Sequence, residues 1–468
     1  MSENQKVPPN AGMPPGPPAL PENWPAMTAD EKFQFLASGL VSIEGKPFVS
    51  PEIAEKYQAR ARRWLDAVAL KEPDRVPCFL SPSGFVRENA GILPVDQFYN
   101  PEIATQAFIK FHEDFDYDYS AIGLVMSGRA LDLLGYRLIR WPGSALPTAL
   151  SEKVSFQYVE DEYMRADEYD QLIANPDGYM TRTFLPRICG GLKGLEIMPS
   201  LYNAVEVVGI TPMLMSLASG PLRETIDTLL KAADQTLTEM TAYRATGLEI
   251  MRRFGTPSLI GGMTFAPFDI IGDTMRGTRG VMLDMYRNPD KLMAACEALV
   301  PASVQMAVQA VMRTRNPFVM IPLHKGADGF MSDEQFARFY WPTFRAQLLG
   351  LIEAGLIPLP FVEGGYDRRL DVIAESGLPA GKTVWLFDRT SMKAAKEKFG
   401  GFACIGGNVP ASLFATGTPE MMESYCKELI DMAAPGGGFF LAPGAVIDQA
   451  KPENMAAYLN ATKKFGVY

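Results

Sequence analysis

The last third of the chain repeats a short apolar run followed by a helix-like stretch, and this repetition limits the folds open to it. Each apolar run has the length of a strand and ends in Gly, Pro or a charged residue. The five stretches are Phe318–Phe330, Ile357–Tyr366, Thr383–Thr390, Phe402–Pro410 and Gly438–Ile447. Alternating strands and helices favour a parallel sheet. In a parallel barrel, the polar residues that follow the strands converge on one face, where the active site lies.

The rest of the chain adds an N-terminal extension and an insertion to this barrel. Residues 1–26 are rich in Pro and predict a flexible tail or an extended arm. Residues 27–75 predict a helical segment, and residues 76–468 the barrel, with its first strands at Val76–Leu80 and Asp118–Met126. Residues 137–200 are interpreted as an insertion near the barrel mouth, with a small hairpin. Further elements are expected at Asp161–Leu172 (helix), Leu222–Phe254 (helix), Ser258–Thr264 (strand) and Asp284–Arg313 (helix).

Composition excludes several classes of partner. The net charge of -10 and pI of about 5.0 disfavour nucleic acid and anionic membranes, which attract basic surfaces. No apolar run reaches the ~20 residues of a membrane helix, and no signal peptide precedes the barrel. Five scattered cysteines without a CxxC pair predict buried, reduced thiols rather than a disulfide framework or a cysteine zinc site. We therefore expect a cytoplasmic protein.

Two strand ends carry the strongest candidates for chemistry. His324 follows an apolar run and can move protons or bind a metal; the alternative is a histidine that closes a barrel hydrogen-bond network. Glu363 precedes paired glycines, and burying its carboxylate unpaired would cost several kcal/mol. The alternative for Glu363 is an ion pair with Arg368 or Arg369.

Weaker candidates surround these two. Asp388 either takes part in the site or caps the helix at Ser391–Phe399, a role for which Thr390 competes. Asn408 is expected to hold loop geometry as much as a ligand, and His112, the other histidine, to be structural. Asp269 and Asp273 are further candidates, with Arg276 and Arg279 nearby. The sequence contains no GxGxxG motif after a strand, no P-loop and no HExxH.

Four stretches of the chain resemble the uroporphyrinogen decarboxylase superfamily. They are RWLDAVALKEPDRVP (63–77), MSDEQFARFYWPTFR (331–345), CIGGNVPASLFATGTPE (404–420) and APGAVIDQAKPENMAAYLNATKKFG (442–466). The resemblance implies a (β/α)8 TIM barrel with its site at the C-terminal ends of the strands. It also implies one of two chemistries: decarboxylation of a porphyrinogen, or methyl transfer involving a corrinoid protein, often with zinc.

The chain departs from both patterns at informative positions. The decarboxylases carry an arginine pair after the first strand and an Asp ending the second, where this chain has only Arg87 and the pair Met126–Ser127. The zinc methyltransferases carry His-x-Cys and a late Cys, where this chain has Phe361-Val362-Glu363 and Ala445. Porphyrinogen decarboxylation and thiol methylation are therefore both disfavoured.

The resemblance then implies an O-demethylase component that moves a methyl group from a small methoxylated, aromatic substrate to the cobalt of a corrinoid protein. His324, Glu363 and Asp388 are the predicted catalytic residues. Either His324 and Glu363 hold zinc as a Lewis acid, or they act without metal as a general acid. The predicted substrate-binding residues are Phe361, Tyr366, Asn408, Met331 and Ser127, with Trp385 and Phe387 as further candidates for the pocket wall.

The chain has no DxHxxG motif of a cobalamin-binding domain, so the corrinoid is expected on a partner protein. A homodimer is also expected. Two alternatives stay open. One is a decarboxylase or another carbon–carbon lyase of a small acid, which would bind carboxylate through Arg87, Arg276, Arg279 or Arg389. The other is a non-catalytic binding subunit with the same fold.

Overall fold

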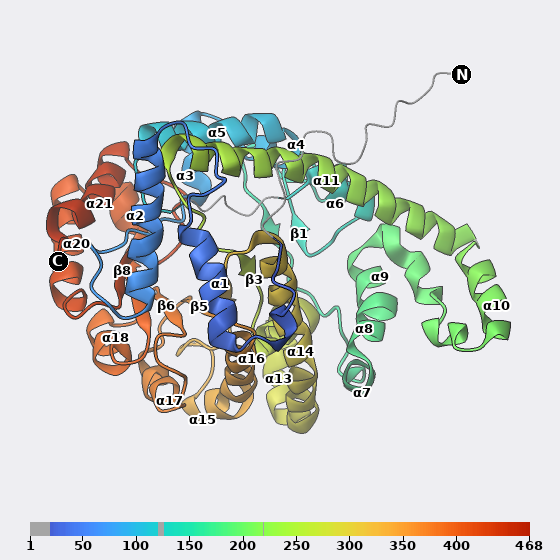
Figure 1. The fold of residues 1–468 in the computed structure, drawn as a ribbon. Coiled ribbons are helices and arrows are strands. Elements are labelled where there is room, and N and C mark those ends of the chain that lie inside the picture. Colours follow the sequence, from blue (N-terminus) through green and yellow to red (C-terminus); the bar gives the residue numbers. More distant parts are fainter. Residues whose placement is uncertain (1–18, 120–125, 219) are drawn as a thin grey trace, which may run out of the picture.

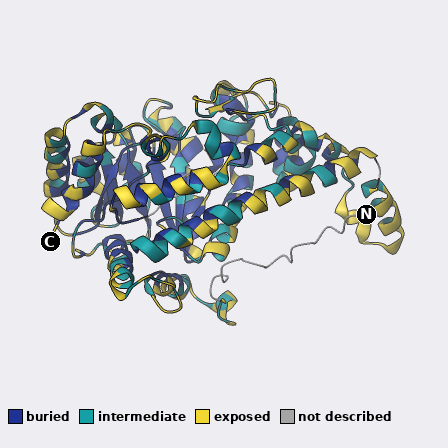
Figure 2. Cartoon of the chain, turned by 90° about the horizontal axis from the view of Figure 1, so that it is seen from above, coloured by how far each residue is buried: buried dark blue, intermediate teal, exposed yellow. Residues whose placement is uncertain are grey.

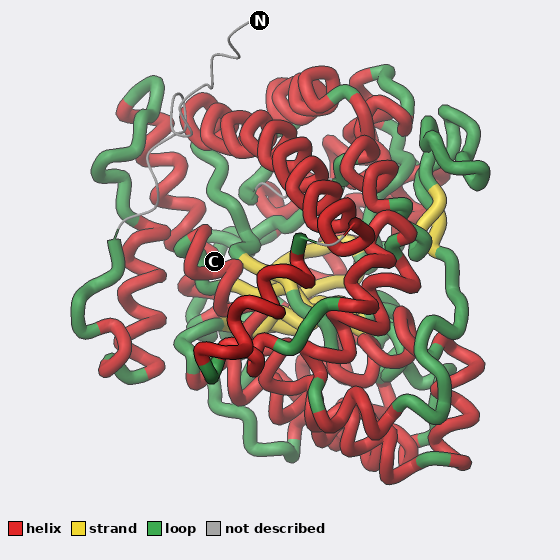
Figure 3. Tube along the Cα trace, turned by 90° about the vertical axis from the view of Figure 1, so that its right-hand side faces the viewer, coloured by secondary structure: helices red, strands yellow, loops and turns green. Residues whose placement is uncertain are grey.

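The computed structural model describes residues 19–119, 126–218 and 220–468, and a parallel sheet forms its centre (Figures 1 and 3). Its six strands pair in chain order. They are β3 (Gly262–Met263), β4 (Phe318–Leu323), β5 (Ile357–Val362), β6 (Val384–Phe387), β7 (Cys404–Val409) and β8 (Phe439–Pro443). The five predicted strands of the last third are all present, as β4 to β8. The predicted strand Ser258–Thr264 shortens to β3.

The sheet continues beyond β8 toward the N-terminal part of the barrel. The backbone N–H of Phe79 donates to the Leu441 carbonyl at 2.9 Å, and the N–H of Leu441 donates to the Pro77 carbonyl at 2.9 Å. The segment predicted as the first strand thus lies beside β8 but forms only an isolated bridge, between Cys78 and Leu441. The predicted second strand falls largely on residues 120–125, outside the described residues. The described residues therefore form an α/β protein with a parallel sheet, and the barrel is not closed within them.

Helices surround the sheet, as Figure 3 shows. In chain order they include α1 (Ala29–Val41), α2 (Pro51–Val68), α3 (Ser83–Ala90), α4 (Pro94–Tyr99), α5 (Pro101–Asp114), α6 (Gly128–Leu134), α11 (Gly220–Phe254), α12 (Pro267–Asp269), α13 (Gly277–Arg287), α14 (Pro289–Thr314), α15 (Asp333–Gln335), α16 (Trp341–Glu353), α17 (Leu370–Ala374), α18 (Met392–Phe399), α19 (Ala411–Thr416), α20 (Pro419–Ala433) and α21 (Pro452–Phe465). The helix predicted at Asp284–Arg313 is two helices, because the chain breaks at Asn288 before Pro289. By length and composition α14 could span a membrane, contrary to the sequence expectation, but it packs on β3, β4 and α16.

Alternate residues of the strands face the barrel interior and the helices. The interior cluster contains Phe318, Leu359 and Phe440, and Trp64 of α2 packs edge-on against Phe318 and Phe440, with ring centroids 5.5 and 5.2 Å apart. Because Phe318 and Phe440 lie at the starts of their strands, α2 covers the N-terminal end of the sheet. The C-terminal ends of the strands, called the mouth below, lie at the opposite end of the sheet from α2. Barrels of this kind carry their active sites there.

The insertion at residues 137–200 contains the predicted hairpin. Its strands β1 (Ile139–Arg140) and β2 (Gln157–Tyr158) pair antiparallel. The helix expected at Asp161–Leu172 is wrong in its start, because the first helix there is α7 (Tyr169–Ala174). The insertion continues through α8 (Pro176–Tyr179), a π-helical turn (Met180–Phe184), α9 (Leu185–Ile188) and a 3-10 helix (Gly190–Ile197).

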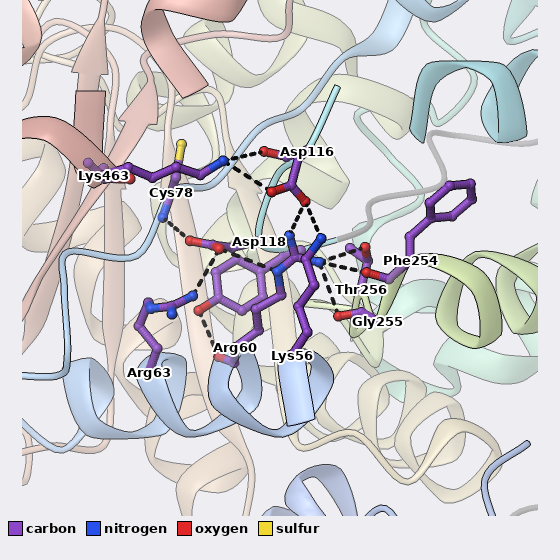
Figure 4. A network of polar contacts seen from close by, with 12 residues as sticks. Lys56, Arg60, Arg63, Cys78, Asp116, Asp118, Phe254, Gly255, Thr256 and Lys463 are labelled. Atoms are coloured by element: carbon purple, nitrogen blue, oxygen red, sulfur yellow. Dashed lines mark hydrogen bonds and ion pairs between the residues drawn. The ribbon is translucent and has the colours of Figure 1, made fainter. Parts of the chain in front are cut away.

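A buried carboxylate ties the N-terminal helices to the start of the barrel. Asp118 is 1% exposed and pairs with Arg75 at 2.6 Å and Arg63 at 2.9 Å. It also accepts the backbone N–H of Cys78 at 3.0 Å, as Figure 4 shows together with the neighbouring pair of Arg60 and Asp116. Burial alone would raise the pKa of Asp118, but Arg75 and Arg63 outweigh it and hold the pKa below its usual value.

Asp118→Asn is expected to lower the free energy of unfolding by about 3–5 kcal/mol, because it leaves buried guanidinium groups without their counter-charge. Chemical denaturation measures the change. Asp371→Asn is the control: its side chain is 65% exposed and its partner Lys398 is 49% exposed, so a loss of about 1 kcal/mol or less is expected. Equal losses in the two variants would contradict the central role of Asp118.

Candidate functional site

The parallel register brings three of the predicted site residues to one level of the mouth. Leu323 pairs with Val362, and Val362 pairs with Phe387. The residues that follow these three are His324, Glu363 and Asp388. Because successive residues alternate between faces, all three continue the interior face of β4, β5 and β6. They come from three different strands and meet only through the fold.

Two carboxylates that follow β3 position His324. Asp269, which is 1% exposed, accepts the backbone N–H of His324 at 3.1 Å and that of Lys325 at 2.9 Å. Asp273 Oδ2 lies 2.5 Å from His324 Nδ1, and Asp273 Oδ1 lies 3.2 Å from Lys325 Nζ. Tyr340 donates a further hydrogen bond to Asp269 at 2.7 Å. The imidazole is therefore held at Nδ1, with Nε2 directed to the other side of the ring.

These carboxylates keep His324 positively charged at neutral pH. Burial alone would lower its pKa, but the hydrogen bond and charge of Asp273, with the charges of Asp269 and Glu363, raise the pKa of His324 to about 9. Burial and the charge of Asp273 in turn raise the pKa of Asp269 to about 6. The imidazole ring of His324 is therefore protonated at neutral pH.

Glu363 lies on the free side of that ring. Its Oε2 is 3.6 Å from His324 Nε2, and its side chain is 47% exposed. Burial raises the pKa of Glu363, and the charges of Asp388 and Asp273 raise it further against the opposing effect of His324. Glu363 thus borders both the imidazole and the opening of the site.

The ion pair expected as the alternative role of Glu363 is not formed. Arg368 pairs with Asp333 at 2.5 Å, and Arg369 pairs with Asp333 and, at 3.4 Å, with Asp328. Both arginines thereby bind the segment between β4 and α16, where Asp328 and Asp333 lie.

Asp388 and Thr390 do not cap α18, so the capping role considered as the alternative for Asp388 is not formed. Ser391 is the N-cap residue and accepts the N–H of Ala394 at 3.3 Å. Asp388 accepts the N–H of Gly364 at 3.0 Å, and Thr390 accepts the N–H of Tyr366 at 3.0 Å. Asp388 therefore shapes the backbone just after Glu363, and it adds negative charge beside that residue.

Several predicted binding residues are buried in the packing. Trp385 and Phe387 occupy the strand positions that face the helices, and both rings pack against Phe399 of α18. Tyr366 is 1% exposed, and its ring meets Phe336 edge-on. Met331 is 4% exposed. Packing therefore accounts for these four side chains.

Other predicted residues have structural partners or lie on the interior face. Phe361 is buried two residues before Glu363 and faces the interior, so it forms part of the floor of the mouth. The Asn408 side chain donates to the Thr390 carbonyl at 2.8 Å, which agrees with its predicted role in loop geometry. Ser127 caps α6 by accepting the N–H of Ala130 at 3.1 Å. His112 is buried and its Nδ1–H donates to the Phe108 carbonyl at 2.8 Å, a structural role as predicted.

A segment of the insertion, residues 156–164 (called the strap below), reaches the site and was not predicted from sequence as part of it. Glu160 accepts from the backbone and hydroxyl of Thr278 at 2.6 and 2.8 Å, and Lys325 Nζ donates to the same hydroxyl at 2.7 Å. Burial and the charges of Glu363 and Asp273 raise the pKa of Tyr158, which places this tyrosine within their field. No local motif signals the contact of Glu160 with Thr278, because these residues lie 118 positions apart.

The donor atoms at the mouth do not fit a catalytic zinc site. Such sites use three protein ligands. His324 Nε2 and Glu363 could supply two, while Asp273 is bonded to His324 and Lys325, and Asp388 to the Gly364 N–H. In the described part of the chain, no group of three or more His, Cys, Asp and Glu side chains could hold a metal ion. All five cysteines are buried and free.

Comparison with known proteins defines the family. Residues 216–465, more than half of the chain, match the family model of uroporphyrinogen decarboxylase (URO-D). The chain therefore belongs to the URO-D family, as its sequence stretches indicated, and the family implies a TIM barrel. A solved structure described as a methyltransferase from Methanosarcina mazei is similar, with 16% sequence identity and a TM-score of 0.54 over 87% of this chain and 98% of that chain. At this identity the likeness shows a shared fold. A search of curated proteins gives no significant match.

Because the chain has only two histidines, proton NMR can measure the charge state of His324 directly. One imidazole is expected to titrate near pH 9 and the other, His112, whose pKa burial lowers, near pH 4. In Asp273→Asn the upper midpoint should fall toward 6.5, the ordinary value, while that of His112 stays. Asp371→Asn, at an exposed carboxylate, should change neither midpoint. A wild-type His324 that titrates near 6.5 would contradict the assigned charge.

Proposed function

We propose that this protein transfers a methyl group from a small methoxylated aromatic compound to the corrinoid of a separate protein. The observation that carries the proposal is the protonated His324 beside Glu363 at the mouth. Cleavage of an aryl methyl ether leaves negative charge on oxygen, and this pair is suited to neutralise it. The fold shared with a protein described as a methyltransferase is consistent with this reaction.

The proposed reaction breaks the bond between the methyl carbon and the ether oxygen. The methyl group passes to the acceptor, and the oxygen keeps the electron pair of the broken bond. The partner's reduced corrinoid supplies the nucleophile that accepts the methyl group. His324 Nε2, or the carboxyl of Glu363 beside it, gives a proton to the departing oxygen, so that a neutral phenol leaves.

The surrounding residues prepare this proton transfer. Asp273 fixes the ring at Nδ1 and keeps it charged, and Asp269 fixes the backbone at His324. Phe361 would form the apolar floor for an aromatic ring, and Tyr158 of the strap a wall. These groups position the ether oxygen at the free nitrogen before the bond breaks.

The arrangement of arginines favours methyl transfer over decarboxylation of a small acid. Arg276 is buried, 5% exposed, and pairs with Asp284 at 2.6 Å and with Glu162. Arg87 donates to Gln97 at 2.6 Å, and Arg389 is 82% exposed. A buried arginine that is already bonded to carboxylates is a poor receptor for a substrate carboxylate. The decarboxylase hypothesis therefore has less support than the methyltransferase hypothesis.

His324→Gln and Glu363→Gln should each slow methyl transfer, with a loss of about 100- to 10,000-fold expected for His324→Gln as the general acid. The assay uses 2-methoxyphenol as donor and chemically reduced free cobalamin as acceptor, with the catechol product measured by chromatography. Glu353→Gln, at an exposed position of α16, serves as the control and should retain full rate. Full rates in both site variants would refute the proposed role of the pair.

The pH profile tests which group holds the proton. If protonated His324 is the acid, kcat/KM should fall as pH rises through about 9, where the ring loses its proton. In Asp273→Asn the fall should move to lower pH, because the carboxylate that raises the pKa is gone. A profile that does not move in Asp273→Asn would assign the proton to another group.

Tyr158→Ala should raise KM for 2-methoxyphenol by up to about tenfold through loss of an aromatic contact. The alkaline limb of the pH profile should stay near pH 9, because Tyr158 is not the acid. Tyr158→Phe should restore KM. An unchanged KM in Tyr158→Ala would place the substrate away from the strap.

A further inference from the structure

A large groove lies in the insertion, apart from the residues assigned to the mouth. It is bounded by the end of α6, the segment around β1, residues 146–148, the strap and the start of the 3-10 helix at Gly190, and is called the side groove below. Figure 1 shows α6 and β1 beside the long helix α11. In Figure 2 the buried residues gather around the parallel sheet, and the surrounding elements carry the exposed surface. The volume of the side groove is about 610 Å³, within the range of small-molecule sites, which is roughly 300–1,000 Å³.

Two arginines give the side groove positive charge. Arg137 and Arg140 both line it, and within the described residues neither forms an ion pair with a carboxylate. Asp132 is the acidic residue among the described residues that line it. Its carboxylate accepts from the hydroxyls of Tyr99 and Ser144 at 2.6 and 2.8 Å. The side groove therefore has two cations against one carboxylate, in a chain whose net charge is -10.

The wall of the side groove holds the Arg137 guanidinium in position. Arg137 Nη1 donates to the backbone carbonyl of Arg187 at 3.3 Å. A Cβ atom on Gly190 would lie 3.2 Å from Arg137 Nη2, so the glycine leaves room for the guanidinium. The nearby carboxylate of Glu168 is already paired with Arg187 at 2.6 Å. A guanidinium has several N–H donors, and those that the Arg187 carbonyl does not accept are available to a ligand.

The rest of the wall suits the body of an organic molecule. Ile139, Pro147 and Val159 contribute apolar side chains, and the rings of Tyr136 and Tyr163 border the same space. Arginine binds carboxylates and phosphates through parallel hydrogen bonds. A free inorganic anion would contact the arginines but leave the apolar and aromatic side chains uncovered. The side groove therefore fits an anionic group that is attached to an apolar or aromatic body.

The side groove and the mouth share the strap but not the catalytic residues. Val159 lines the side groove. Its neighbours face the mouth: Tyr158 lies in the field of Glu363, and Glu160 accepts from Thr278 at 2.8 Å. A ligand in the side groove would thus contact the segment that carries Tyr158 without reaching the proposed acid.

We propose that the side groove is a second small-molecule site, which binds an organic anion with a carboxylate or phosphate group on an apolar or aromatic body. Arg137 and Arg140 bind the anionic group, and Tyr136, Tyr163 and the apolar side chains contact the body. The proposal does not rest on methyl transfer, because none of the residues assigned to that reaction as acid or acid partner lines the side groove.

Isothermal titration calorimetry of the full chain tests the site with three probes: benzoate, phenyl phosphate and inorganic phosphate. At least one organic probe should bind about tenfold or more tightly than inorganic phosphate, and the preferred probe identifies the anionic group as carboxylate or phosphate. Arg137→Gln and Arg140→Gln should each weaken binding by about tenfold or more, through loss of a charge-assisted hydrogen bond. Arg62→Gln, at an exposed arginine of α2, is the matched control and should bind as the wild type does. Absence of binding by both organic probes at millimolar concentration, or equally tight binding of inorganic phosphate, would overturn the proposal.

A second pair of variants separates the side groove from the mouth, where protonated His324 also attracts anions. Thr148→Trp places a neutral ring in the side groove and should abolish binding. Thr148 is exposed, so circular dichroism should stay unchanged. His324→Gln should bind the organic probe as the wild type does. Binding that is lost in His324→Gln but retained in Thr148→Trp would place the anion at the mouth and refute the second site.

Discussion

The parallel register between β4, β5 and β6 places His324, Glu363 and Asp388 at the same level of the mouth. A shift of one residue in any of these strands would turn its terminal polar residue toward the helices. The register is stabilised at both ends of the sheet. Trp64 fills the interior at the strand starts, and Asp269 binds the backbone where β4 ends. The chemistry of His324 and Glu363 therefore depends on the packing of the whole sheet.

The electrostatics of the mouth follow from the same arrangement. The carboxylates at the mouth follow β3, β5 and β6 in the chain, and His324 lies among them. Asp273, Asp269 and Glu363 each make the proton on His324 harder to remove, while burial opposes the charge. The carboxylates dominate, so the ring is an acid at neutral pH rather than a base. This polarity is what suits the site to a leaving oxygen.

Sequence reasoning could find the strands and their terminal residues, because both depend on local patterns. The runs that became β4 to β8 are short, apolar and bounded by Gly, Pro or charge, and His324 and Glu363 stand at their ends. The pairing of His324 with Asp273 and the contact of Glu160 with Thr278 could not be found, because each joins distant segments. The cap of α18 also stayed open: Asp388, Thr390 and Ser391 can all cap a helix, and only the fold shows that the first two are engaged elsewhere. Trp385 and Phe387 show the same limit. Alternation along a strand separates its residues into two faces, but the sequence does not show which face is turned toward the helices.

The strap is bound to the site outside the sheet, through side chains and through a backbone hydrogen bond from the Met164 N–H to the Met275 carbonyl at 2.7 Å. Glu160 reaches Lys325 only by way of the Thr278 hydroxyl, and the strap adds no strand to β3–β8. The proposed substrate wall at Tyr158 and the proposed acid His324 thus lie on separate segments. Glu160, Thr278 and Lys325 join these segments, and so does buried Arg276, which bonds Glu162 and the Met164 carbonyl. Changes in the insertion could therefore alter the proposed substrate wall, while the ends of β4 and β5 keep His324 and Glu363 in place.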